Sequence, residues 1–179
     1  MTHDNKHLEL FETALEFPEE YWEEPLIGEM PEDLRAFWDE YGLGLFDNGY
    51  LRTNDPFKLN EHFSRLSHLI DLDEHVPVMS TAFGDVITYD RKGTYYSWDL
   101  LTGRVSPCGV RFDLLLKDLH EEFFRSELFT PSEGFDEAVK RFGAPSVNKV
   151  FTRDEDGRIT GQELFSDFTT RNETWFTLQ

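Results

Sequence analysis

The chain has 179 residues and a formal net charge of −19, with 17 Lys and Arg against 36 Asp and Glu. This charge argues against direct nucleic-acid binding, and a single cysteine excludes an internal disulfide and a Cys-based zinc site. No apolar run approaches the ~18–20 residues that span a bilayer, so we expect a reduced, cytoplasmic protein without a membrane partner. Aromatic residues make up 15% of the chain, enough to build the core of one domain, or of two small ones sharing a core.

Three helices and a short strand are predicted in the first half. Apolar residues at helical spacing predict an amphipathic helix over 8–15 and another over 57–69. A third helix is predicted over 31–41, because Pro31 suits a first turn and Gly42 suits the position after the last. Residues 50–53 have the composition of a strand.

The negative charge is concentrated in this half, where residues 1–75 hold 19 acidic and 5 basic side chains. One acidic segment, with two aromatic residues inside it, consists of Glu19, Glu20, Tyr21, Trp22, Glu23 and Glu24. A second cluster, in a predicted loop, consists of Asp71, Asp73 and Glu74. Both fit either a solvated surface or a surface complementary to a basic partner.

The second half is predicted to be richer in strands. In chain order the expected elements are an extended segment at 76–79, a hairpin of 82–89 with 94–98, a strand passage at 100–106, helices at 113–125 and 135–142, a hairpin of 147–153 with 158–165, and a last strand at 174–178. This order predicts an α+β fold, with an antiparallel sheet flanked by helices and an extra C-terminal β-hairpin tail.

The sequence contains no strong catalytic or metal-binding pattern. Asp154, Asp156, Gly157 and Glu163 match positions of a calcium loop, but Thr152 stands where the first carboxylate belongs and the preceding segment favours a strand. We therefore interpret the segment from Asp154 to Glu163 as a hairpin with an acidic turn. The single cysteine, Cys108, has no nearby histidine in sequence, which argues against a catalytic cysteine. Since no other strong pattern is present, we expect no catalytic residue, no metal and no cofactor.

Several segments resemble a known bacterial family. Met30–Gly44 resembles the signature of GAD-like domains, and Phe46–Leu51 and Asn54–Pro56 continue the match. Thr81–Val86 resembles the start of the immunity domain that adjoins it, and Phe135–Gly143 resembles that domain's late helix. The resemblance implies a GAD-like part at 1–75 and an immunity-type part at 76–145. The tail at 146–179 does not match the family's usual continuation and is predicted to be a hairpin specific to this protein.

Proteins of this family are proposed to give immunity to DNase effectors of type VI secretion systems. The resemblance thus implies a non-enzymatic antitoxin that binds a cognate secreted toxin in the cytoplasm. Since a nuclease presents a basic cleft, the two acidic clusters are the expected contact residues. The alternative is a regulatory or scaffolding module that binds a peptide or a small ligand in a deep apolar pocket.

Overall fold

The computed structural model describes residues 10–63, 74–130 and 132–176. In chain order its elements are β1 (Leu10–Leu15), η1 (Glu19–Glu23), α1 (Pro25–Gly28), α2 (Glu32–Tyr41), β2 (Leu43–Phe46), η2 (Asp47–Gly49), β3 (Leu51–Thr53), α3 (Pro56–Phe63), β4 (His75–Thr81), β5 (Val86–Asp90), β6 (Tyr95–Asp99), β7 (Arg104–Gly109), α4 (Phe112–His120), α5 (Glu122–Leu128), α6 (Phe135–Phe142), β8 (Lys149–Arg153), β9 (Ile159–Leu164) and α7 (Phe165–Phe176), where η marks a 3₁₀ helix. None of the helices in these ranges is long and apolar enough to cross a bilayer.

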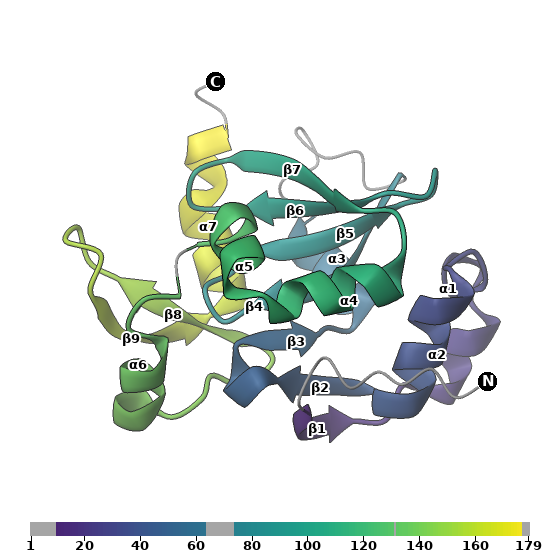
Figure 1. Ribbon diagram of the computed structural model, residues 1–179, viewed down its shortest axis with the longest axis horizontal. Coiled ribbons are helices and arrows are strands. Elements are labelled where there is room, and N and C mark those ends of the chain that lie inside the picture. The colour runs from purple at the N-terminus through teal and green to yellow at the C-terminus, as the bar shows by residue number, and fades with distance from the viewer. Residues whose placement is uncertain (1–9, 64–73, 131, 177–179) are drawn as a thin grey trace.

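The described strands form one antiparallel meander and a separate hairpin. Seven of them pair in the order β1-β2-β3-β4-β5-β6-β7, so each lies beside its neighbour in sequence, and β8 pairs with β9. The predicted α+β class, the antiparallel sheet and the tail hairpin are confirmed. Figure 1 shows α4 and α5 in front of the sheet, with α3 behind it.

Two hydrophobic clusters hold these layers together. The larger one joins α2 to the sheet and to α4, and Phe37 of α2 contacts Phe112 of α4 with ring centroids 5.2 Å apart. The smaller one covers the other face, where Phe165 and Phe168 of α7 pack with Trp98 of β6. The C-terminal tail therefore packs against the main sheet instead of projecting from it.

Buried polar contacts attach distant segments to the sheet. Arg52 of β3 is fully buried and donates to the backbone carbonyls of Ser146 and Lys149, which fixes the start of the tail. Asp85 follows β4 and accepts hydrogen bonds from the Oγ1 atoms of Thr81 (2.6 Å) and Thr130 (2.9 Å). The turn at 82–85 thus has a structural explanation in the contacts of its carboxylate.

Four predicted elements differ from the structure. Residues 10–15 form strand β1 instead of a helix, because pairing with β2 supplies the backbone hydrogen bonds. The helix expected over 113–125 is two helices, because Glu121 has an extended backbone (φ −82°, ψ 120°). Strand β5 begins only at Val86, since 82–85 is a turn, and the strand expected at 174–178 is instead the end of helix α7 up to Phe176.

The remaining elements of the prediction are confirmed where the structure describes them. Helix α2 begins at Glu32 and ends before Gly42, whose φ of 64° favours glycine. Helix α3 occupies the first part of the range 57–69, and its later part lies outside the described residues.

Candidate partner-binding site

The acidic segment from Glu19 to Glu24 is held against the body by its two aromatic residues. Tyr21 donates a hydrogen bond from its hydroxyl to Asp55 at 3.0 Å, and its ring contacts Phe57 at 4.6 Å between centroids. Trp22 packs on the ring of Phe17 at 4.7 Å. Both aromatic side chains are half-buried, so each still presents part of its surface to solvent.

The carboxylate side chains of this segment are exposed to solvent. Glu19, Glu20, Glu23 and Glu24 are exposed, and none forms an ion pair with another described residue. The short 3₁₀ helix η1 and Glu24, which follows it, therefore present four negative charges next to two half-buried aromatic rings.

A cavity of about 610 Å³ lies between this segment and the end of α2. We call it the acidic hollow; its walls are Glu16, Phe17, Glu19, Trp22, Asp39, Glu40, Tyr41 and Gly42. Four of these residues carry carboxylates, three are aromatic, and no lysine, arginine or histidine is among them. Such walls favour a ligand with positive charge and a flat or apolar part.

The position of Asp39 and Glu40 strengthens this interpretation. Both are exposed in the last turn of α2, which contains no basic residue. The C-terminal end of a helix carries partial negative charge, so an acidic side chain there destabilises the helix by ~0.3–1 kcal/mol. Both charges are therefore unfavourable for the helix end, whereas a cation in the acidic hollow would be stabilised by both.

Asp33, in the matched signature, has a different and structural role. Its Oδ2 atom accepts a hydrogen bond from the backbone N–H of Phe112 at 3.0 Å, which caps the start of α4. Leu34, Phe37 and Trp38 are buried in the core. The signature therefore stabilises the scaffold, while the residues beside it form the acidic hollow.

Glu74, the described residue of the second acidic cluster, does not line the acidic hollow. Glu74 forms an ion pair with Lys92 at 2.8 Å, so its charge is already balanced. Asp71 and Asp73 lie outside the described residues.

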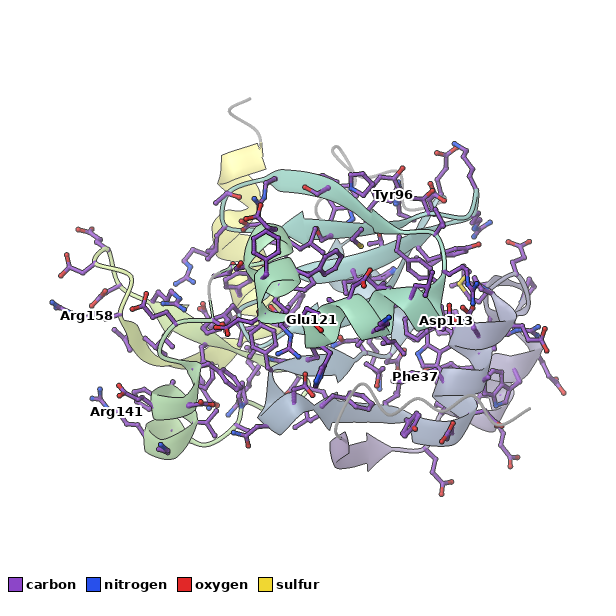
Figure 2. All side chains as sticks on the ribbon, in the orientation of Figure 1. Phe37, Tyr96, Asp113, Glu121, Arg141 and Arg158 are labelled. Atoms are coloured by element: carbon purple, nitrogen blue, oxygen red, sulfur yellow. The ribbon has the colours of Figure 1, made fainter. Side chains whose placement is uncertain are left out.

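A charge-balanced cavity of about 430 Å³ lies between α6 and the β8–β9 hairpin. Figure 2 shows Arg141 of α6 and Arg158 of the hairpin turn at the same end of the molecule. Arg158 pairs with Asp156, and Arg153 donates to the carbonyl oxygens of Gly157 and Glu133. Since three arginines and three acidic residues line it, this cavity favours neither sign of charge.

Chemistry that depends on a thiolate or a metal ion finds no support among the described residues. Cys108 is buried, and burial raises the pKa of its thiol to about 12, which keeps it protonated. No group of three or more His, Cys, Asp or Glu in the described ranges could hold a metal ion. The segment from Asp154 to Glu163 forms a hairpin, where Asp154 accepts from the turn N–H of Arg158 and Glu163 pairs with Arg171.

Comparison with known proteins identifies the part of the chain that contains the acidic hollow. Residues 16–97 match the GAD-like domain family. All eight residues that line the acidic hollow lie in the N-terminal part of this matched range. The match ends at residue 97, within β6, so one continuous sheet runs from the matched range into the rest of the chain.

The fold as a whole is similar to a solved structure, the crystal structure of Atu4351 from Agrobacterium tumefaciens. The TM-score is 0.76 at 16% sequence identity, and the similarity covers 95% of this chain and 87% of that one. A likeness at this identity establishes a shared fold that extends well beyond the matched residues 16–97. No curated protein sequence gives a significant match.

Sequence reasoning found one wall of the acidic hollow and missed the other. It selected Glu19 and Trp22, but not Glu16, Asp39 or Glu40. A signal for the missed wall was present, because Asp39 and Glu40 lie in the last turn before Gly42, and acidic side chains are unfavourable at that end of a predicted helix.

Proposed function

We propose that this protein is a non-enzymatic immunity protein, which binds a cognate secreted toxin in the cytoplasm and blocks the toxin's basic substrate surface. The observation that carries the proposal is the acidic hollow, where four carboxylates and three aromatic rings meet without a basic side chain among the walls. The resemblance to immunity proteins of type VI secretion DNase effectors also supports the binding of a secreted toxin. A nuclease has to bind phosphates, so it presents a positively charged substrate surface.

The mechanism would be steric and electrostatic blockade. An arginine or lysine at the rim of the toxin's cleft would enter the acidic hollow, its charge facing Asp39 and Glu40 and its stem lying on Trp22. The net charge of −19 would steer the encounter and raise the association rate at low salt. The inhibitor would need no turnover, only slow dissociation.

The alternative of a module that binds a small apolar ligand has less support. Three cavities on the described surface, of about 430, 610 and 700 Å³, have charged side chains as about half of their walls. A deep apolar pocket with a few converging polar groups, which that alternative requires, is not among them.

Co-expression with the secreted protein encoded next to this gene tests the proposal. We expect the wild-type chain to rescue growth, and the purified pair to form a 1:1 complex whose association rate falls as salt rises. The variant Asp39→Asn/Glu40→Gln should weaken the complex, whereas Glu32→Gln at the opposite end of α2 should not. Failure of the wild-type chain to rescue, or a complex insensitive to both salt and the double variant, would refute the proposal.

A further inference from the structure

The buried arginine of β3 has no opposite charge beside it. Arg52 is fully buried, and no aspartate or glutamate among the described residues forms an ion pair with it. Burial lowers the pKa of its guanidinium to about 9, and no charged neighbour offsets this effect. Since the group is still protonated at neutral pH, the fold encloses an uncompensated positive charge, which destabilises a protein interior.

Only part of this guanidinium is engaged by the fold. Its Nη1 atom donates to the backbone carbonyl oxygens of Ser146 (3.1 Å) and Lys149, at the start of the tail. The Nε and Nη2 atoms of Arg52 are buried and have no hydrogen-bond partner among the described residues. These two N–H groups form an edge that suits a bidentate pair with a carboxylate. The tail therefore covers Arg52 and supplies two carbonyl dipoles, but no negative charge.

The described part of the tail, residues 146–176, begins with a hairpin that is only lightly attached to the body. The hairpin forms a sheet of its own and pairs with none of the seven strands of the meander. The backbone N–H of Phe151 donates to the carbonyl oxygen of Ala82 at 2.8 Å. Val150 and Phe151 are buried, but no residue of β9 is. The cavity of about 430 Å³ lies between this hairpin and α6, so the two are not closely packed along their whole length.

Helix α7 provides the second attachment of the tail. Phe165 and Phe168 pack with Trp98 in the smaller hydrophobic cluster, and the ring of Phe168 lies over Gly84, where it leaves no room for a Cβ atom. Figure 1 shows α7 and the hairpin together at the end of the molecule that is opposite α1 and α2. Burial of these rings favours docking of the tail. The enclosed charge of Arg52 opposes it, because undocking lets water reach the guanidinium.

We propose that residues 146–176 form a strap that undocks from the sheet as one unit, and that the uncompensated charge of Arg52 sets the balance between its docked and undocked forms. A unit with few buried contacts opens at a lower free energy than the whole domain unfolds. The seven-stranded meander stays paired in the undocked form, because β8 and β9 take no part in it. The strap thereby controls access to the face of the sheet around Trp98. This inference does not depend on the proposed function, since no residue of the strap lines the acidic hollow.

Native-state hydrogen exchange of the full chain, at low concentrations of urea, tests whether the strap undocks. We expect the amides of β8 and of the first turns of α7 to exchange through one common opening, at least roughly 10-fold faster than the amides of the central strand β5. If both groups exchange only by global unfolding at every urea concentration, the strap does not undock separately and the inference is wrong.

A matched pair of variants tests the role of the charge. Ser80 of β4 lies directly opposite Arg52 in the sheet, so the two side chains are neighbours on the same face. Ser80→Asp adds a carboxylate beside the guanidinium, whereas Ser80→Asn has nearly the same shape and no charge. Compared with Ser80→Asn, Ser80→Asp should slow exchange of the strap relative to β5 by at least about 5-fold. An equal ratio of strap to β5 exchange in the two variants would show that the charge does not set the balance.

Arg52→Met provides a second test that does not depend on how well position 80 accepts a larger side chain. This variant removes the charge and keeps a long, flexible side chain in its place. We expect it also to slow exchange of the strap relative to β5 by at least about 5-fold, although two hydrogen bonds to the tail are lost. Faster exchange of the strap in Arg52→Met would mean that Arg52 holds the strap in place, which would overturn the inference.

Discussion

Removing the charge of Glu40 should stabilise the protein, although Glu40 lies at the candidate binding site. Glu40 is exposed in the last turn of α2, and Glu32 is exposed in the first turn of the same helix. Glu40→Gln and Glu32→Gln therefore make the same chemical change at opposite ends of one helix dipole. The first removes an unfavourable interaction and the second a favourable one, each worth ~0.3–1 kcal/mol.

The free energies of unfolding of these two variants should thus differ by roughly 0.6–2 kcal/mol, with Glu40→Gln the more stable. Both reduce the net charge equally, so a general relief of repulsion cancels in the comparison. Urea unfolding at low ionic strength measures the difference, which should shrink at high salt because the dipole interaction is screened. Equal stabilities, or a more stable Glu32→Gln, would refute the argument that Glu40 is placed for binding at a cost in stability.

Three further predictions concern the scaffold. Gly84→Ala should destabilise by more than ~2 kcal/mol in thermal or urea unfolding, because the new Cβ would lie 2.3 Å from Cε1 of Phe168 in addition to the cost of a positive φ. Gly93→Ala, which also has a positive φ but nothing within 4 Å, is the control and should lose only about 1 kcal/mol. Burial raises the pKa of Asp85 to about 6, so the folded state binds this proton more tightly than the unfolded state. The free energy of unfolding of the wild type, compared with that of Asp85→Asn, should therefore rise by up to roughly 3 kcal/mol as pH falls from about 6.5 to 4. If the difference in unfolding free energy between the two proteins did not change with pH, this prediction would be contradicted. Cys108 should react with a disulfide reagent at pH 8 only after unfolding, and rapid labelling of the native protein would show that its burial is wrong.

Local sequence signals predicted the elements whose own residues determine their conformation. Helix α2 has an apolar stripe at helical spacing, a proline before its first turn and a glycine after its last turn. The sequence therefore predicted where this helix begins, which face is buried and where the helix ends. The hairpin of β5 and β6 was readable from its turn residues and its aromatic and β-branched composition. The sequence also singled out Tyr21 and Trp22 as aromatic residues within an acidic segment, but it did not predict their packing on Phe57 and Phe17.

Strand β1 and helix α7 show where local signals fail. A six-residue segment with Leu10, Phe11 and Leu15 is too short for periodicity to separate a helix from a strand, and pairing with β2, about thirty residues later, decides between them. The tail carries aromatic residues that suit either a strand or a buried helix. The contact of Phe165 and Phe168 with the second face of the sheet gives α7 the burial that short helices need.

The acidic hollow shows the same contrast between what the local sequence predicts and what tertiary contacts decide. The sequence by itself determined an acidic, aromatic-rich chain with an α+β order of elements, because composition and short-range spacing are properties of neighbouring residues. Only the tertiary structure placed Glu16, Glu19 and Trp22 opposite Asp39 and Glu40, since that requires the turn after β1 to pack against the end of α2 through Phe17 and Trp38. A cavity consists of the space between elements, and contacts between distant residues determine that space.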